Sequence, residues 1–405
     1  MSKVFLLMLD GISADTFHNH RGRLPFLSRL ADGAFSVERL SSLVPGISLP
    51  GRASILTGRS AAEAGVYGNN IWHDTQFSYA TPDDVRVPTL PQLALQAGLD
   101  VAAIGFGMVR PEDATVFRRP WWADAFIQRA RDVEPAPAEG AWLRAAEHVD
   151  ATGRLAAAAA AAGFPDDYPL RFPDRRIYGL TGDLHVANWA GLLAATDPAP
   201  DFLLTELLMT DSIQHRYGFD SEEALWALSY LDSLVGVILH RLGDRAAEYN
   251  FVVLSDHGHW HVKQALRPAA LLPGMHADAQ GALLHVKVDS PEDEARATSR
   301  LAEFGVTPFD RSYLPADHRE FLRSYLAPDD YGFEAGPADE PVTAPSNISS
   351  HGLRPGHPAD DRFMFLSGPD VEAGNVATAA ADQVAPTVAR LLGLDLGPFP
   401  GEPLL

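Results

Sequence analysis

The chain has 405 residues, of which 46% are apolar and 21% are charged, a balance typical of globular proteins and not of disordered ones. Its formal charge of −21 argues against a nucleic-acid polymer as partner, because such proteins need clustered Lys and Arg to displace counterions from phosphates. The absence of cysteine excludes disulfides, cysteine-ligated zinc and a thiol nucleophile, so nitrogen and oxygen side chains must bind any metal.

The first predicted element is a buried strand over Val4–Leu9, followed by Asp10 and Gly11. Its apolar run is short for a signal peptide and lacks a convincing cleavage site. No run of about 18 apolar residues is found elsewhere, so we expect no membrane span and a cytoplasmic location. Asp10 falls at the carboxyl end of the strand, where sheets of this kind bind ligands, although Asp-Gly pairs also form plain turns.

A helix predicted over Leu24–Leu30 is followed by the segment Val44–Gly58, which contains Ser48 and Pro50. Proline favours the first turn of a helix, so Ser48 is expected to cap a helix that starts there. A helix N-terminus favours an anion, which would make the Ser48 hydroxyl easier to ionise and suited to nucleophilic attack. A capping serine without catalytic role is the alternative. Arg52, four residues later, is expected to bind a phosphate oxygen or to form a surface ion pair.

Strands and helices alternate along the rest of the chain. The further predicted strands are Val101–Phe106, Phe202–Leu208, Phe251–Leu254 and Phe363–Leu366, and the helices are Leu90–Gln96, Trp142–Ala162, Leu184–Ala195, Ser221–Leu242 and Ala379–Leu392. This alternation predicts a doubly wound, mostly parallel α/β sheet flanked by helices. Two stretches, at about 109–178 and 260–347, break the rhythm; the second holds one strand, Ala282–Val288, and a helix from Pro291. We interpret both as insertions into one domain, with a separate second domain as the alternative.

Acidic and histidine side chains recur where predicted strands end. Asp211 and His215 follow one strand and are four residues apart, so one helical turn would place them on the same face. Asp256 and His257 follow the next strand, separated from it by Ser255, and His351 precedes the last. The candidate ligands are Asp10, Asp211, His215, Asp256, His257 and His351. Such a mixed nitrogen and oxygen set suits zinc better than calcium or magnesium, and two ions flanking an attacking oxygen are typical of phosphoryl displacement.

This pattern resembles the alkaline phosphatase superfamily, specifically its nucleotide pyrophosphatase/type I phosphodiesterase branch, over stretches in family order from Asp10 to Gly368. The resemblance implies two zinc ions, one held by Asp10, Ser48, Asp256 and His257 and the other by Asp211, His215 and His351. It also implies attack by the Ser48 alkoxide through a phosphoseryl intermediate. The segment Gly65–Asn70 looks like the stretch after the nucleophile helix, so we expect Asn69 and Asn70 to line the substrate pocket, with a turn as the alternative.

The chain also departs from that branch. Ser48 stands where threonine is usual, and Gly51 stands three residues later although the branch has a nearby asparagine that holds a phosphate oxygen. The stretch from Ser48 to Arg59 resembles the sulfatase signature as well, in which Cys or Ser becomes formylglycine. In sulfatases, two acidic residues generally follow the first strand and the site uses a single calcium ion. This chain has Asp10-Gly11 at that point and ligands for two metal ions. A sulfatase and a non-catalytic metal-binding scaffold are therefore the less favoured alternatives.

The expected substrate is a small phosphate ester, with a diester favoured over a monoester. A monoester carries two negative charges and needs dense positive compensation, whereas only Arg52 lies near Ser48 in the sequence. The second ester group of a diester needs an apolar pocket, which Trp121 and Trp122 would line if they are not core residues. A phosphomonoesterase is the alternative, and the sequence does not indicate the oligomeric state. Exposed loop positions are expected for four unassigned histidines: His18, His20, His259 and His261.

Overall fold

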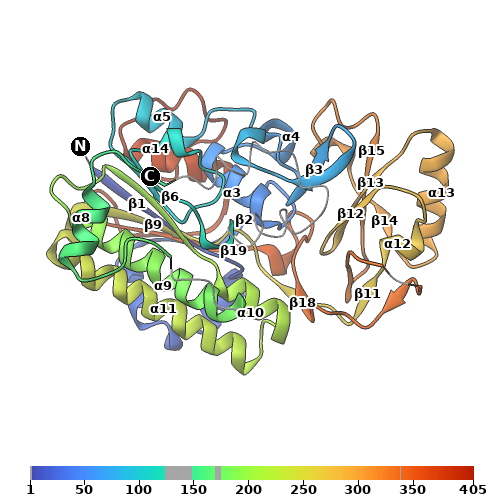
Figure 1. Cartoon of the computed structure of the whole chain (residues 1–405), viewed down its shortest axis with the longest axis horizontal. Coiled ribbons are helices and arrows are strands. Elements are labelled where there is room, and N and C mark those ends of the chain that lie inside the picture. Colours follow the sequence, from blue (N-terminus) through green and yellow to red (C-terminus); the bar gives the residue numbers. More distant parts are fainter. Residues whose placement is uncertain (1, 124–147, 169–174, 338) are drawn as a thin grey trace.

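A nine-stranded sheet forms the centre of the computed structural model, which describes residues 2–123, 148–168, 175–337 and 339–405 (Figure 1). The strand order is β20-β2-β19-β9-β1-β8-β5-β6-β7. Their bounds are β1 (Lys3–Leu9), β2 (Phe35–Ser41), β5 (Val101–Ile104), β6 (Val116–Arg118), β7 (Val149–Asp150), β8 (Phe202–Leu207), β9 (Tyr249–Leu254), β19 (Arg362–Ser367) and β20 (Gly374–Ala380). Strand β1 lies parallel between β8 and β9, so the carboxyl ends of these three strands meet at one edge.

Helices cover both faces of this sheet. Figure 1 shows α9 (Arg175–Ala194) and α11 (Glu222–Leu242) on one side and α3 (Ser48–Thr57), α5 (Leu90–Gln96) and α14 (Val384–Leu391) on the other. The central strands β8 and β9 are buried along their whole length, as a parallel sheet covered on both faces requires. The predicted doubly wound, mostly parallel α/β class is confirmed, with β19 and β7 running antiparallel to their neighbours.

The helix α11 also meets the length and hydropathy of a membrane-crossing helix. The stretch Glu222–Glu248 is long and apolar enough for a span. Within the described residues, however, α11 packs along α9 and buries most of one face in the core. A core helix of a sheet protein passes the same test of length and composition, so this match is weak evidence for a membrane.

All five predicted strands of the main sheet are present, but two predicted helices are wrong in part. The predicted helix Ala379–Leu392 begins only at Val384, because its first residues finish the edge strand β20. Of the predicted helix Trp142–Ala162, positions 142–147 lie outside the described residues, and Gly153, with φ of 66°, separates β7 from the short α8 (Arg154–Ala161). Strands β2, β6, β7 and β20 were not predicted.

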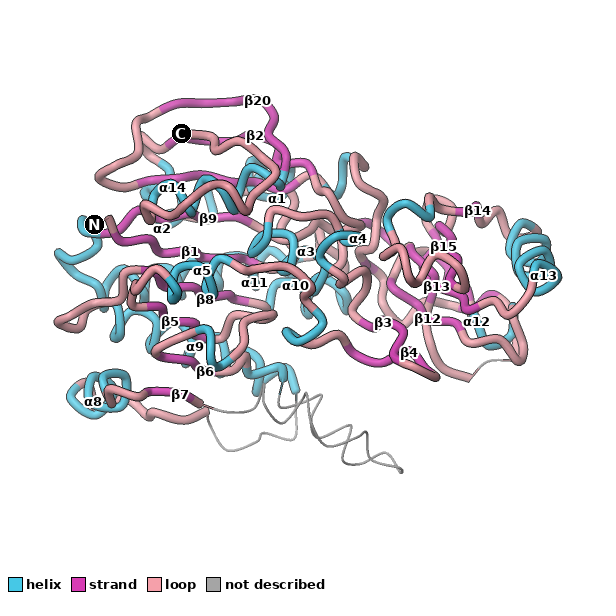
Figure 2. Tube along the Cα trace, turned by 90° about the horizontal axis from the view of Figure 1, so that it is seen from above, coloured by secondary structure: helices cyan, strands magenta, loops and turns pink. Residues whose placement is uncertain are grey.

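A second, smaller unit stands at one end of the molecule and is called the cap below (residues 264–343; Figures 1 and 2). It contains a three-stranded sheet of β11 (Gln264–Leu266), β16 (Tyr331–Phe333) and β17 (Val342–Thr343) and a four-stranded sheet of β12 (Ala277–Gln280), β13 (Leu283–Lys287), β14 (Thr307–Pro308) and β15 (Leu322–Leu326). Helix α13 (Pro291–Ala302) closes its own apolar core. The predicted strand and helix of this stretch are thus present. By contrast, β6 and β7 of the 109–178 stretch extend the main sheet.

Candidate active site

The end of β1 brings three parts of the chain together at the carboxyl edge of the sheet. Asp10 is fully buried and is followed by Gly11, whose φ is 75°. A Cβ atom at Gly11 would lie 3.0 Å from Nε2 of His259 and 3.2 Å from Cα of Asp211. Glycine is therefore required here both by the left-handed backbone and by the close approach of the neighbouring segments.

The first group of candidate ligands surrounds the buried imidazole of His257. Its Nε2 atom lies 3.1 Å from Oγ of Ser48, 3.3 Å from Oδ1 of Asp10 and 3.6 Å from Oδ2 of Asp256. Donors on a tetrahedral zinc, with bonds of about 2.0–2.2 Å, lie roughly 3.3–3.6 Å apart. Oδ1 of Asp10 is buried and has no hydrogen-bond partner in the described part of the chain. These four side chains therefore fit one divalent ion.

The second group contains Asp211, His215 and His351, which lie within 4.8 Å of one another at their ligand atoms. Helix α10 (Met209–Tyr217) carries Asp211 and His215 one turn apart, with Oδ1 and Nε2 separated by 3.3 Å. Nδ1 of His215 lies 2.9 Å from the carbonyl oxygen of Ser349 and donates to it, which leaves Nε2 free to bind a metal. The structure thus brings together all the ligands that the resemblance implied.

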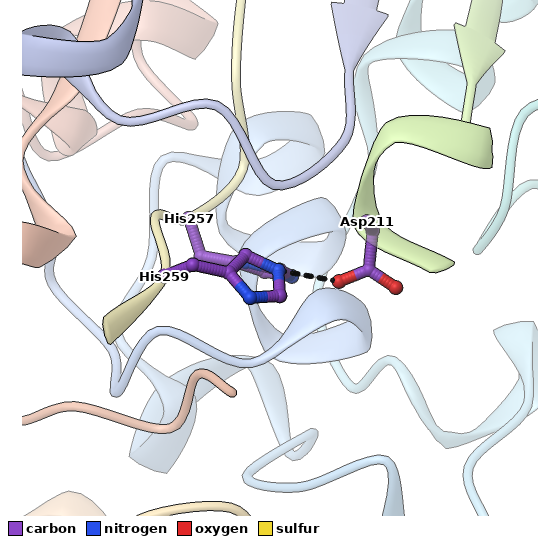
Figure 3. A group of neighbouring side chains, drawn as sticks. All are labelled: Asp211, His257 and His259. Carbon is purple, nitrogen blue, oxygen red and sulfur yellow. Dashed lines mark hydrogen bonds and ion pairs between the residues drawn. The ribbon is translucent and has the colours of Figure 1, made fainter. Parts of the chain in front are cut away.

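One further histidine, His259, belongs to this cluster and was not foreseen. Figure 3 shows it beside His257, facing Asp211, and its Nε2 lies 2.9 Å from Oδ1 of Asp211. Its Nδ1 lies 3.0 Å from Oγ of Ser349, and the residue is buried. The spacing of two residues from His257 in an extended segment is the signal that points to a shared face. Of the other unassigned histidines, His261 is exposed, as expected.

Burial sets the protonation of these groups. It lowers the pKa of His257 and His351, and it lowers the pKa of His259 to about 4, so these imidazoles are neutral. Burial opposes ionisation of Asp211, but His215 and His259 outweigh it and hold the pKa of Asp211 well below its usual range. A neutral imidazole and an ionised carboxylate are the forms that bind metal, so these four groups are in their metal-binding forms. Two other ligand candidates shift the opposite way: burial raises the pKa of Asp10, and Asp211 outweighs burial and raises the pKa of His215.

The nucleophile candidate Ser48 is the first residue of α3, and Ile47 occupies the cap position that we expected for the serine. The Ser48 side chain is therefore not used to cap the helix, and its Oγ faces His257. The unexpected Gly51 has a spatial reason: a Cβ there would lie 3.0 Å from the carbonyl oxygen of Asp256. Gly51 lets the nucleophile helix pack directly against the strand end that carries the ligands.

Arg52 does not lie where we expected it. It is completely buried, and its guanidinium makes ion pairs of 2.5 Å with Asp10, 2.8 Å with Glu206 and 3.0 Å with Asp256. This geometry contradicts both the substrate contact and the surface ion pair. Glu206, a buried acidic residue in the mostly apolar β8, was missed; it also accepts hydrogen bonds from Gly107 and Trp122. Arg52 therefore holds carboxylates of the first ligand group in place.

The two asparagines have different surroundings. Oδ1 of Asn69 accepts a hydrogen bond of 2.9 Å from the backbone N–H of Leu49, beside the nucleophile. Its Nδ2 is then the group left to donate to a ligand. Asn70 instead donates through Nδ2 to Oδ1 of Asp278 in the cap, 2.9 Å away. Asn69 is thus placed at the nucleophile, whereas the amide of Asn70 is engaged with the cap.

The two tryptophans that we considered for the substrate pocket are core residues. Trp121 and Trp122 are 2% and 6% exposed, and their Nε1 atoms donate to Asp183 and Glu206 at 2.6 and 2.7 Å. Their burial contradicts a role in lining an open pocket.

Comparisons with known proteins support the fold and identify the family. The family described as type I phosphodiesterase/nucleotide pyrophosphatase matches residues 4–336. Among solved structures, murine ectonucleotide pyrophosphatase/phosphodiesterase 5 is 14% identical, with a TM-score of 0.66 over 99% of this chain and 97% of that one. An inactive variant of the murine protein in complex with AMP is 13% identical, with a TM-score of 0.67 over 99% of this chain and 98% of that one. The human protein is also 13% identical, with a TM-score of 0.66 over 99% of this chain and 97% of that one.

A search of curated protein sequences gave no match. The family match covers most of the chain, and the structural neighbours share its fold from end to end. The chain therefore belongs to the type I phosphodiesterase/nucleotide pyrophosphatase family, within the alkaline phosphatase superfamily, and is a hydrolase of phosphoric esters.

Proposed function

We propose that this protein is a phosphodiesterase that cleaves small phosphodiesters by attack of Ser48. The observation that carries the proposal is the position of Ser48, whose Oγ lies 3.1 Å from His257 within a group of four buried or half-buried donors. A serine hydroxyl without such neighbouring groups would be a weak nucleophile at neutral pH. The neighbouring group around Asp211 has the side chains to hold a second cation, which supports the proposal.

The cofactors that we propose are two divalent ions of the zinc type, one in each ligand group. When bound, they would supply positive charge to the phosphate and favour the alkoxide form of the attacking hydroxyl. The described donors are all nitrogen or oxygen atoms of His, Asp and Ser, which suits zinc. Positive charge from such ions would replace the basic side chain that Arg52, buried among carboxylates, does not offer to the substrate.

The proposed reaction has two displacement steps at phosphorus, the first of them by Ser48. Ser48 Oγ attacks phosphorus in line, the bond to the leaving alcohol breaks, and the alcohol departs with a proton. The remaining phosphoryl group is then esterified to Ser48 until water attacks the same phosphorus and releases a phosphomonoester and free Ser48. Asn69, fixed through its Oδ1 on Leu49, would donate from Nδ2 to a non-bridging oxygen, where negative charge grows in the transition state.

The substrate that we propose is a small diester or pyrophosphate rather than a monoester. The AMP held by the structurally similar murine protein supports a nucleotide-like phosphate ester. Arg52, which forms ion pairs with two carboxylates of the first ligand group, is fully paired and does not offer its charge to the substrate. A dianionic monoester needs dense positive compensation, and Arg52 does not contribute to it.

Competing substrates on one preparation test this proposal. The ratio kcat/KM for bis-(p-nitrophenyl) phosphate is expected to exceed that for p-nitrophenyl phosphate on zinc-loaded protein, with Ser48→Ala as the background control. A preference for the monoester of tenfold or more, about 1.4 kcal/mol of transition-state stabilisation, would replace the phosphodiesterase by a phosphomonoesterase.

A further inference from the structure

The cap meets the active site through Gln280, the last residue of β12, and the short turn of Gly281 and Ala282 that leads to β13. The Gln280 side chain is buried, and its Oε1 accepts a hydrogen bond of 2.9 Å from the backbone N–H of Asn69. Its Nε2 donates to Oδ2 of Asp278, whose other oxygen accepts from Asn70. Three side chains, those of Gln280, Asp278 and Asn70, thus form one polar network with the backbone N–H of Asn69, the residue beside the nucleophile.

The backbone of the same turn lies against the segment that carries His351. The N–H of Ala282 donates to the carbonyl oxygen of His351 at 2.9 Å. A Cβ at Gly281 would lie 2.0 Å from that carbonyl oxygen, and a Cβ at Gly352 would lie 2.0 Å from the carbonyl oxygen of Gln280. Both glycines have φ in the left-handed region, at 72° and 89°. The two backbones can approach this closely only because neither position carries a side chain.

Backbone hydrogen bonds also link the segment that carries His351 to the loop that precedes Ser48. The N–H of Gly352 donates to the carbonyl oxygen of Gly46 at 2.5 Å, and Gly46 N–H donates to Leu353 at 2.9 Å. Gly46 precedes Ser48 by two residues. One turn of the cap therefore contacts the asparagine beside the nucleophile, the backbone of a metal-ligand candidate and, through one further pair, the loop that leads to Ser48.

We propose that the cap is a positioning element for the reaction and that Gln280 is the positioning residue through which it fixes Asn69. The inference rests on the proposed role of Asn69 at a non-bridging phosphate oxygen. Asn69 is held at two points, its Oδ1 on Leu49 and its N–H on Gln280. Loss of the second point leaves the part-buried N–H of Asn69 without this partner and frees the residue to move, and small displacements of a donor strongly reduce its effect on a transition state.

A double-mutant cycle on the full, zinc-loaded chain tests this coupling. Asn69→Ala is expected to lower kcat by about 10²–10³-fold, the usual effect of removing one such donor. Gln280→Ala is expected to lower kcat about tenfold with little change in KM, but to have less than a twofold effect in the Asn69→Ala background. Gln264→Ala, an exposed glutamine of the same cap, is the matched control and should leave kcat unchanged.

A rescue variant separates positioning from general damage to the fold. Combining Gln280→Glu with Asp278→Asn keeps an acceptor for the Asn69 N–H and reverses the donor and acceptor between the two cap side chains. This double variant is expected to recover most of the lost kcat. Gln280→Glu alone places two carboxylates side by side and is expected to recover none of it. Equal losses from Gln280→Ala in both backgrounds, or no loss at all, would overturn the proposal.

Hydrogen exchange keeps the test independent of turnover. In the peptide that contains Asn69, Gln280→Ala should increase amide exchange, and Gln264→Ala should not. If the protein hydrolyses no diester but exchange rises as expected, the proposed function fails while the structural coupling holds. Unchanged exchange together with an unchanged kcat would refute the coupling itself.

Discussion

The buried cation Arg52 allows a sharp test of how the site is held together. Replacement by methionine, which has a similar length and no charge, would leave three buried carboxylates, Asp10, Glu206 and Asp256, without their shared partner. The guanidinium makes its contacts at 2.5–3.0 Å and is inaccessible to water. Removal of one partner from a buried ion pair typically costs 3–5 kcal/mol, and we expect about this loss for Arg52→Met in metal-free protein.

A bound cation should reduce that loss, because it would compensate two of the same carboxylates. We therefore expect Arg52→Met to lose less than half as much free energy of unfolding in excess zinc as in EDTA. Arg52→Lys keeps the charge but cannot reach three carboxylates at once, so an intermediate loss is expected. The matched control is Arg296→Met, whose exposed pair with Asp293 should contribute at most about 0.5 kcal/mol.

Urea denaturation of these variants, with and without zinc, measures both effects. A loss below 1 kcal/mol for Arg52→Met in EDTA would show that the three carboxylates are not held as ions by Arg52. An equal loss in zinc and in EDTA would show that Arg52 does not act at the proposed metal site.

Three further predictions concern the metal ions, the nucleophile Ser48 and the buried Asp183. Chelation should abolish activity and zinc should restore it, with two ions per chain by elemental analysis; one calcium and no transition metal would favour a sulfatase. Ser48→Ala should abolish turnover and leave metal content and unfolding nearly unchanged, so an active variant would refute Ser48 as nucleophile. Burial raises the pKa of Asp183 to about 7, so its folded form binds a proton more tightly than the unfolded chain. The free energy of unfolding of wild type relative to Asp183→Asn should therefore fall by up to about 4 kcal/mol as the pH rises from 4 to 7, and a rise would contradict that pKa.

Much of the site was predictable because its ligands follow apolar strands in the sequence. Asp10 comes directly after β1 and Asp256 comes two residues after the end of β9, and the register of a parallel sheet then places both at one edge. The predicted environment of Arg52 was wrong, because its spacing of four residues from Ser48 does not indicate which face of α3 is buried. Glu206 looked like part of an apolar strand, and only the folded structure shows that it is the buried partner of Arg52.

The fold was predictable where hydrophobic patterns are long and was missed at the edges. Strands β2 and β20 lie at one edge of the sheet and alternate polar with apolar residues or expose most of their length, so they lack a continuous apolar run. The cap contact was beyond prediction for a different reason: Asn69 and Gln280 are 211 residues apart, and no local pattern links them.

The central claim, covalent catalysis by Ser48 on a phosphodiester, is tested most directly by mass spectrometry of protein quenched during turnover. With bis-(p-nitrophenyl) phosphate, the peptide that contains Ser48 should carry one p-nitrophenyl phosphoryl group, and the adduct should be absent from Ser48→Ala. Turnover without any adduct on that peptide, or formylglycine at position 48, would contradict the mechanism.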